Sequence, residues 1–294
     1  MERNKKLQLN KKKLIIITIH SFRGIENIIK KIIAILLLIP CIFFAIMIIE
    51  PQMLEVNEIT VQSTQIPKEF NGTRIALIAD FHYGEYVNED RVRYVVSKTN
   101  EQHPDIIILG GDYVTDNKEN ILPCINILSD LKATYGVYAV LGNNDPKDAT
   151  EEIINQTHIK SIRNQGLWIE KNGEKIRLGG VGDLSTDYQY PRKTTNPATT
   201  DDFVILAYHN PNYFPLINHH MTDLSLSGHT HGGQINFFGY APRVQPANNG
   251  KQYLSGLYEE EGSQLIVTNG VGETKLPFRF MAVPQITIVK LEST

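Results

Sequence analysis

Side chains that could bind a divalent cation or move a proton occur in five short clusters along the chain. They carry carboxylate, amide or imidazole groups, and each cluster directly follows a run of apolar, mostly β-branched residues. The five clusters together contain seven such side chains: Asp80, His82, Asp112, Asn143, His209, His229 and His231. A lone histidine after a strand is more often a structural residue with one hydrogen bond. Five such clusters in order indicate a site, and Asp80 and His82 are spaced so that both can turn toward one ion.

The apolar runs before these clusters predict strands, and amphipathic intervals between them predict helices. We expect strands at Ile75–Ala79, Ile106–Leu109, Val137–Leu141, Ile176–Leu178, Val204–Ala207, Leu224–Leu226, Leu265–Thr268 and Ile286–Val289. We expect helices at Glu89–Glu101, Asn120–Lys132 and Ala149–Asn164. The carboxyl ends of strands in an α/β sheet meet in one crevice. The seven polar side chains should therefore face one place.

An apolar run near the amino terminus predicts a membrane anchor. Residues 32–49 form a run of eighteen uncharged residues. A helix needs about 20 residues to cross the hydrocarbon core, so the run is nearly long enough. The run has no polar face and no small-residue cleavage site after it, which favours an uncleaved transmembrane helix over a core helix or a signal peptide. Nine Lys or Arg precede it and one, Lys68, lies in the next twenty residues. The positive-inside rule then predicts a single-pass protein of the cell (inner) membrane with a cytoplasmic amino terminus and the body on the outer side.

The charge distribution separates the ends of the chain. Residues 1–31 hold nine basic and two acidic residues, a balance of +7, so the remainder of a chain with net charge −3 carries −10. An acidic body does not fit a nucleic-acid groove, which needs clustered basic side chains. Two cysteines, Cys41 and Cys124, cannot form a framework of several disulfides. We divide the chain into a basic segment (1–31), the anchor (32–49), a connector with a first strand (50–70) and a folded domain (71–294).

The clusters resemble a known family in sequence. The series Asp80-x-His82, Gly111-Asp112, Gly142-Asn143, His209 and Gly228-His229-x-His231 resembles the calcineurin-like metallophosphoesterase superfamily, over roughly Ile59 to Leu291. The block GHTHGGQ, the anchor and the ending Leu276-Pro277-Phe278-Arg279 are similar to its membrane-anchored branch, which includes the YkuE and YaeI phosphoesterases. The resemblance implies an α/β (α+β) fold, a four-layer sandwich of two mixed β-sheets flanked by helices. It makes residues 71–294 the metallophosphoesterase domain.

The resemblance also implies a role for each cluster. It assigns Asp80, His82 and His231 to a first metal ion, Asp112 to a bridge, and Asn143, His209 and His229 to a second ion. A donor set without thiolate suits Mn, Fe or Zn. Two such cations would activate a water as hydroxide and stabilise charge on phosphoryl oxygens. The expected protein is a membrane-anchored hydrolase of a phosphodiester or pyrophosphate bond, with a phosphate-containing small molecule or lipid as its substrate.

One residue departs from the family pattern. The family usually has His after the metal-binding Asn, and this chain has Asn144. An amide cannot deliver a proton, so general-acid assistance, typically 10²–10⁴-fold, is lost for poor leaving groups. A phosphate leaving group has a pKa near 6 and needs little protonation, so Asn144 favours a pyrophosphate bond. Alternatively, one of four other histidines could supply the proton: His103, His158, His219 or His220.

Two other functions stay open at this point. The lipid A pathway hydrolases that cut UDP-2,3-diacylglucosamine resemble this branch, but their nucleotide substrate is cytoplasmic and the charge count places the body outside. A tethered, non-catalytic metal-binding module would be favoured by loss of a ligand, and all seven predicted ligands are present. We expect the aromatic residues Tyr188, Tyr190, Phe237 and Phe238 to pack in the core rather than face lipid.

Overall fold

A computed structural model describes residues 1–115, 117–242 and 244–294; the side chains of residues 2, 4, 8–10, 12–21 and 23–25 are outside this description. The chain divides into two units, Met1–Met47 and Ile48–Thr294. The first consists of most of helix α1 (Glu2–Ile49), which contains Pro40. Its apolar stretch is long enough to cross a membrane. The helix includes residues 32–49 and also the basic segment before them.

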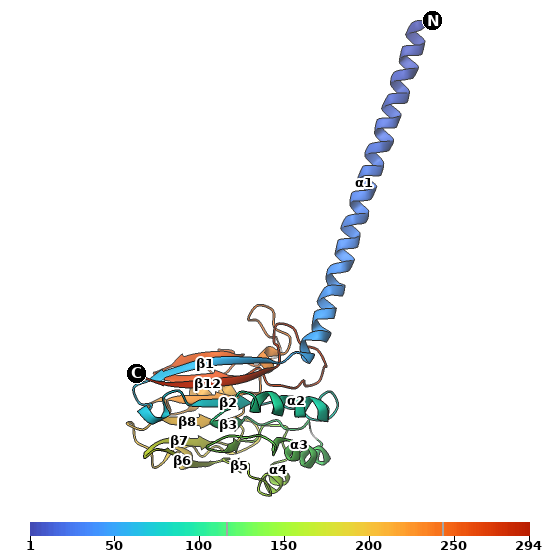
Figure 1. The fold of residues 1–294 in the computed structure, drawn as a ribbon. Coiled ribbons are helices and arrows are strands. Elements are labelled where there is room, and N and C mark those ends of the chain that lie inside the picture. Colours follow the sequence, from blue (N-terminus) through green and yellow to red (C-terminus); the bar gives the residue numbers. More distant parts are fainter. Residues whose placement is uncertain (116, 243) are drawn as a thin grey trace. The chain divides into compact units, whose positions relative to one another are not determined.

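The body contains two six-stranded sheets (Figure 1). The first has the order β1 (Glu55–Ser63), β12 (Gln285–Ser293), β2 (Arg74–Ile78), β3 (Ile106–Leu109), β4 (Val137–Ala139) and β5 (Lys160–Ser161). The second has the order β10 (Gly256–Glu260), β11 (Ser263–Val267), β9 (Leu224–Ser227), β8 (Val204–Ala207), β7 (Glu174–Gly180) and β6 (Gln165–Lys171). Both are mixed: β2 to β5 run parallel, as do β7, β8, β9 and β11, while β12 is antiparallel to β2 and β6 to β7.

Alternation along the strands separates two apolar layers. Ile75 and Leu77 of β2 pack between the sheets, against residues such as Ile205 and Leu224. Ala76 and Ile78, on the opposite face of the same strand, pack under the helices. Because β2 is buried on both faces, it reads as a continuous apolar run rather than an alternating one. Each fully buried Leu or Ile contributes roughly 1.5–3 kcal/mol, so these layers hold the strand ends in place.

Helices cover the outer face of the first sheet, and shorter turns cover the second. The first set is α2 (Glu89–Asn100), α3 (Ile121–Leu128) and α4 (Lys147–Ile154). The other helical segments are α5 (Pro191–Thr195), η1 (Glu50–Gln52), η2 (Lys68–Phe70), η3 (Lys118–Asn120), η4 (Pro211–Leu216), η5 (His219–Met221) and η6 (His231–Gly233). Tyr213 and Phe214 of η4 pack on the outer face of the second sheet. The predicted fold of two mixed sheets flanked by helices is confirmed.

Two expectations are wrong in detail. The helix expected at Ala149–Asn164 is α4, which ends at Ile154, because the chain then turns and pairs Ser161 of β5 with Ala139 of β4. The aromatic residues expected in the core, Tyr188, Tyr190, Phe237 and Phe238, are all exposed. The layer between the sheets is filled mainly by aliphatic strand residues, together with Phe70, Tyr138 and Phe203. The four exposed aromatic residues lie in loops.

Candidate metal centre

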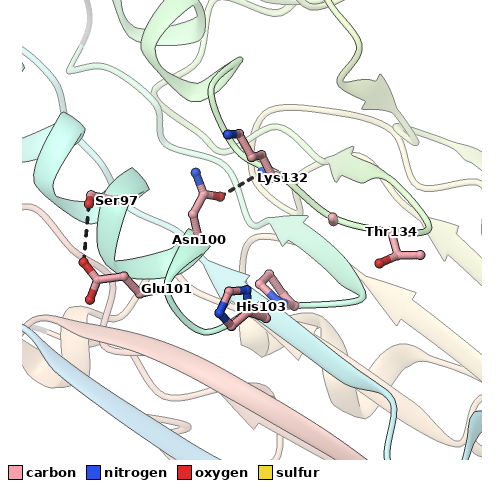
Figure 2. Close-up of a pocket in the computed structure, with 8 residues that line it drawn as sticks. Ser97, Asn100, Glu101, His103, Lys132 and Thr134 are labelled. Carbon is pink, nitrogen blue, oxygen red and sulfur yellow. Dashed lines mark hydrogen bonds between the residues drawn. The ribbon is translucent and has the colours of Figure 1, made fainter.

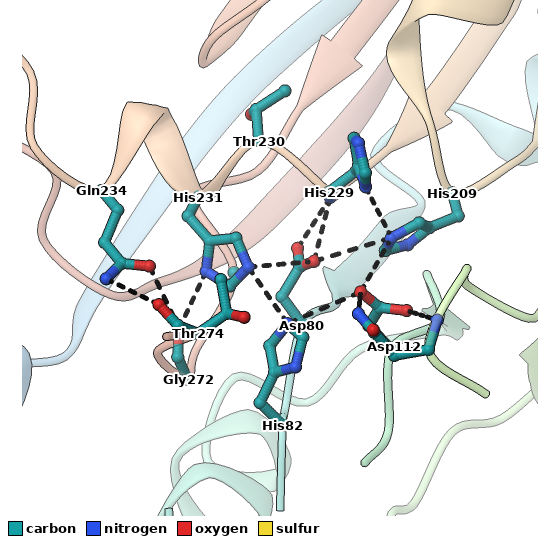
Figure 3. Close-up of polar contacts among 12 residues, drawn as sticks. Asp80, His82, Asp112, His209, His229, Thr230, His231, Gln234, Gly272 and Thr274 are labelled. Carbon is teal, nitrogen blue, oxygen red and sulfur yellow. Dashed lines mark hydrogen bonds and ion pairs between the residues drawn. The ribbon is translucent and has the colours of Figure 1, made fainter. Parts of the chain in front are cut away.

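The polar clusters converge at the carboxyl ends of the central strands of both sheets (Figure 3). Asp80 and His82 follow β2, and Asp112 follows β3. His209 follows β8, while His229 and His231 follow β9. Asn143 follows β4 and lines the same cavity as His82, Asp112 and His229. The chain thus brings together the seven side chains that the sequence singles out, although they are spread over about half its length.

Six of these side chains form two groups whose donor atoms lie within 4.8 Å of one another. The first is Asp80, His82 and His231, and the second is Asp112, His209 and His229. In the first group the Nε2 atoms of His82 and His231 are 3.1 Å apart. In the second, His209 Nε2 lies 3.1 Å from His229 Nδ1. In each group, two imidazole nitrogens face each other closely. Two histidine ligands of a single metal ion have the same arrangement.

Asp112 belongs to the second group and also lies close to the first. Its Oδ2 atom is 3.2 Å from His209 Nε2 and 3.5 Å from His82 Nε2. One carboxylate oxygen therefore faces an imidazole of each group. A bridging ligand of a two-metal site requires this position.

Asn143 supplies a test of whether a metal fits. Its Oδ1 atom is buried and has no hydrogen-bond partner among the residues that the structure describes. A buried amide oxygen without a partner is costly. A cation ligated by that oxygen would satisfy it, and imidazole, carboxylate and amide donors are a normal set for Zn, Mn or Fe. The residues present fit a metal site.

The ligand candidates share an unusual backbone conformation. Positive φ angles occur at Asp80 (58°), His82 (47°), Asp112 (56°), His229 (73°) and His231 (54°). Non-glycine residues seldom adopt this region, and each such residue costs on the order of 1–3 kcal/mol. The surrounding sheets must supply that energy. Strain of this kind is concentrated where side chains are held for a function.

Glycine allows two of the strand ends to approach each other. A Cβ on Gly142 would overlap the Asp112 carboxylate, and one on Gly111, whose φ is +89°, would overlap the backbone at Gly142. Any larger residue at either position would push the loop of Asp112 away from that of Asn143.

Hydrogen bonds to the far ring nitrogens orient three imidazoles. The pairs are His82 Nδ1 with Thr115 Oγ1 (3.0 Å), His209 Nδ1 with the Gly110 carbonyl (2.7 Å) and His231 Nδ1 with the Gly272 carbonyl (3.0 Å). Each leaves Nε2 to face the centre. Such partners fix the tautomer and the ring orientation of metal-binding histidines.

Two supporting residues were not identified from the sequence. The carboxylate of buried Asp145 accepts hydrogen bonds from the backbone N–H groups of Asp112, Tyr113 and Gly142 (2.7–2.8 Å). Buried Arg279 donates to the carbonyls of Gly272 (2.6 Å), Ala282 (2.6 Å) and His231 (3.3 Å). Asp145 ends the Gly-Asn-Asn-Asp tip, and Arg279 ends the matched carboxyl-terminal motif. Their positions in these motifs were the available signal.

Burial and neighbouring charges set the protonation of the site. Burial alone would raise the pKa of Asp112, but the charges of His209 and His82 outweigh it and hold that pKa below its ordinary value. Burial and the charge of His209 lower the pKa of His229 to about 4. Burial and nearby His82 hold the pKa of His231 well below its ordinary value. At neutral pH these residues are an anionic carboxylate and two neutral imidazoles, the forms that bind cations.

Asp80 and His209 differ from these groups. Burial raises the pKa of Asp80 to about 7. Burial opposes charge on His209, but the adjacent Asp112 carboxylate raises the pKa of His209 well above its ordinary value. Both groups therefore hold a proton more readily than Asp112, His229 and His231.

A cavity of about 440 Å³ opens over the centre and is lined by Asp112, Asn143, Asn144, His229 and His231 among others. This volume suits a small phosphorylated ligand. The Asn144 side chain points at the bridge candidate: its Nδ2 donates to Asp112 Oδ2 at 2.7 Å, and its backbone N–H donates to Asp112 Oδ1 at 2.8 Å. Asn144 both orients this carboxylate and forms part of the cavity wall.

The other four histidines lie away from the centre. Each precedes a parallel strand rather than following it: His103 precedes β3, His158 precedes β5, and His219 and His220 precede β9. They are therefore at the opposite edge of the sheets. Figure 2 shows His103 in a separate cavity of about 780 Å³ with Ser97, Asn100 and Lys132. The alternative of a proton donor among these four residues is not supported by their positions.

Comparisons with known proteins agree with this geometry. The calcineurin-like phosphoesterase family profile matches residues 73–233. The chain is 31% identical over 258 residues to the metallophosphoesterase YkuE of Bacillus subtilis (strain 168), covering 84% of this chain and 88% of that protein. It is 30% identical over 227 residues to the phosphodiesterase YaeI of Escherichia coli (strain K12), covering 74% and 82%.

A third relative carries a membrane segment in its name. The chain is 28% identical over 255 residues to a transmembrane protein with metallophosphoesterase domain of Danio rerio, covering 81% of this chain and 57% of that protein. With more than half of its length matched by the family profile, the chain belongs to the calcineurin-like phosphoesterase family and is a metal-dependent hydrolase of phosphoester bonds.

Proposed function

We propose that this protein is a membrane-anchored phosphoesterase that uses two divalent cations to hydrolyse a phosphodiester or pyrophosphate bond. The main support is the position of Asp112, whose Oδ2 faces His82 of one cluster and His209 of the other. Asp80, His82 and His231 would hold one ion, and Asn143, His209 and His229 the other. Asp112 would bind both. The donor set suits Mn, Fe or Zn.

Two bound cations would lower the pKa of a water and stabilise negative charge on phosphoryl oxygens. The protein residues have the remaining tasks. The low pKa of Asp112 keeps it ionised, and the low pKa values of His229 and His231 keep their lone pairs available. Asn144 holds Asp112 in orientation and presents an amide, rather than an acid, to the leaving group.

The leaving group is therefore the expected determinant of substrate choice. An alkyl phosphodiester expels a strongly basic alkoxide, whereas a pyrophosphate or an aryl ester expels a weak base. The proposed phosphoesterase activity includes both kinds of bond. Hydrolysis of a nucleotide diphosphate lipid, as in lipid A synthesis, is a second candidate that Asn144 favours. The acidic body, with a charge of −10 outside residues 1–31, supports a small molecule or lipid rather than nucleic acid as the partner.

A variant at the bridge tests the centre. Asp112→Asn should lower hydrolysis of bis(p-nitrophenyl) phosphate in Mn²⁺ more than about 100-fold, because even loss of an outer-shell partner costs about 10- to 100-fold. Metal content, measured by elemental analysis, should fall with it. The fold should persist, since burial together with the charge of Asp112 raises the pKa of both Asp80 and Asp145 to about 7, and neutralising Asp112 relieves that repulsion.

The matched control is Asp148→Asn, an exposed carboxylate in the first turn of α4. It should retain full activity and metal content. Normal activity of Asp112→Asn with a normal circular dichroism spectrum would exclude the proposed centre.

A second variant tests the leaving-group argument. The wild type should cleave an aryl phosphodiester far faster than an alkyl one, and Asn144→His should reduce that ratio by about 10²-fold or more by restoring a proton donor. Asn144→Ala is the control, because it removes the hydrogen bond to Asp112 and should slow both substrates alike. An unchanged ratio in Asn144→His would show that protonation by this position does not limit the reaction.

Metal uptake should depend on pH through Asp80. Since the pKa of Asp80 is about 7 in the protein without metal, protons compete with the cation below pH 7. The Mn²⁺ affinity should rise at least about tenfold per pH unit below pH 7, and it should keep rising above pH 7 because the raised pKa of His209 means that this ligand must also lose a proton. Calorimetric titration at pH 6, 7 and 8 measures this, and an affinity independent of pH over that range would contradict the assignment of Asp80 as a ligand.

Topology is tested separately. Because basic residues precede the apolar run, the amino terminus (1–31) should be cytoplasmic, the anchor (32–49) should span the membrane, and the connector (50–70) and catalytic domain (71–294) should lie outside. Protease added to intact spheroplasts should digest the body. Protection of the body until the cells are lysed would reverse this orientation and would favour the cytoplasmic nucleotide substrate.

A further inference from the structure

Two neighbouring loops of the body expose large apolar side chains. We call this group the aromatic rim: Phe237, Phe238, Tyr240, Leu276 and Met281, with exposed fractions of 43%, 88%, 63%, 41% and 46%. Single exposed apolar residues are ordinary, but several on adjacent loops indicate a surface that contacts a partner. Aromatic side chains are typical of surfaces that meet the lipid headgroup region.

Hydrogen bonds fix the two loops of the rim to each other. Asn236 N–H donates to the Phe280 carbonyl (2.9 Å), and Phe280 N–H donates to the Gln234 carbonyl (2.8 Å). Gln234 Nε2 also donates to the carbonyls of Leu276 (2.8 Å) and Phe278 (3.2 Å). The rings of Phe237 and Phe280 are 5.7 Å apart. The rim residues are thereby held on two loops that are hydrogen-bonded to each other.

Phe238 occupies the tip of a tight turn in which an aromatic residue is unusual. Phe237 and Tyr240 exchange backbone hydrogen bonds (2.8 and 3.1 Å), and Phe238 and Gly239 have φ of 52° and 95°. Such turns normally carry Asn-Gly or Asp-Gly, as the β6–β7 turn does with Asn172 and Gly173 (50° and 91°). The exposed ring of Phe238 at this position is explained if it enters an apolar environment.

The chain enters the body beside the rim. The uncharged run ends at Ile49, and buried Glu50 accepts hydrogen bonds from the backbone N–H groups of Met281 (3.0 Å) and Ala282 (2.5 Å). Arg91 donates to the carbonyls of Pro51 (3.2 Å), Gln52 (3.3 Å) and Met53 (2.6 Å). Ile48 and Ile49, the last residues of the uncharged run, belong to the same unit as the body. The face around Met281 is therefore hydrogen-bonded to the first residue after the uncharged run, where the chain is expected to leave the hydrocarbon.

The same two loops form one wall of the cavity over the metal centre. Gln234, Val244, Thr274 and Lys275 line it, and Lys275 is exposed beside Leu276. The mouth of the cavity thus adjoins the rim. The positively charged side chain of Lys275 lies at the boundary between them. A phosphate attached to an acyl or prenyl chain could enter from this side while its chain stays in the bilayer.

From these observations we propose that the aromatic rim inserts into the headgroup region of the membrane that holds the anchor, and that the substrate is a lipid phosphoester taken directly from that membrane. The substrate class rests on the proposed function, whereas the insertion of the rim does not. Phe238 and Tyr240 act as interfacial anchors. They take no part in the chemistry.

A depth measurement on the full chain in lipid nanodiscs tests the insertion. A spin label is placed at Phe238→Cys or at Asn172→Cys, the matched turn at the opposite edge of the body, with Cys41→Ser to prevent labelling of the anchor; Cys124 is buried. The label at position 238 should be relaxed mainly by oxygen, which concentrates in lipid, and that at 172 mainly by a water-soluble nickel chelate. Equal access of the nickel chelate to both labels would overturn the proposal.

An activity comparison in the same nanodiscs tests the substrate class. The probes are a nitrophenyl phosphodiester with a hexadecyl chain and soluble bis(p-nitrophenyl) phosphate, which share a leaving group. Phe238→Ser should slow the lipid probe at least about tenfold, the effect of removing one buried aromatic side chain, and leave the soluble probe unchanged; Asn172→Ser should change neither. An equal loss on both probes would overturn the lipid assignment. If wild type cleaves neither probe, the proposed function fails, and the depth measurement still decides the insertion.

Discussion

The arrangement depends on one carboxylate held between two groups of imidazoles. Asp112 is buried, and burial alone would neutralise it; the charges of His82 and His209 keep it ionised. Its own position is fixed by Asn144 on its oxygens and by Asp145 on its backbone N–H. A buried anion is stable only with such compensation. The strand ends of both sheets must therefore stay together for this group to keep its charge.

The sheets supply the energy for that constraint. Five ligand candidates adopt positive φ, and together they cost several kcal/mol at about 1–3 kcal/mol each. Aliphatic layers on both faces of β2 and β3 offset this cost. Gly142 and Gly111 remove the side chains that would otherwise separate the loops. The backbone strain is located in the loops, and the stabilising apolar contacts are located in the strands. The strands therefore hold the site in place, and the site does not stabilise the strands.

Much of this was predictable from the sequence, and the reason differs by element. Buried parallel strands such as β3 and β8 are unbroken β-branched runs, so their bounds and the polar residues after them could be read directly. Strands β6 and β10 mix polar and apolar residues without a regular pattern at the two edges of the second sheet, and α4 is followed by a polar stretch that resembles a continuation of the helix. Asp145 and Arg279 bind backbone atoms of loops distant in sequence. Such partners leave no local pattern, and neither does the exposure of Phe238.

Glu50 and Arg279 belong to one continuous path of hydrogen bonds in the body. Glu50 holds the N–H of Ala282, Arg279 holds the carbonyl of that same residue, and Arg279 also contacts the carbonyl of His231. Three successive hydrogen-bonded steps therefore connect Glu50, the first residue after the uncharged run, to the backbone carbonyl of the candidate ligand His231. A displacement of Glu50 would therefore reach the backbone of a candidate ligand through hydrogen bonds that lie within the body.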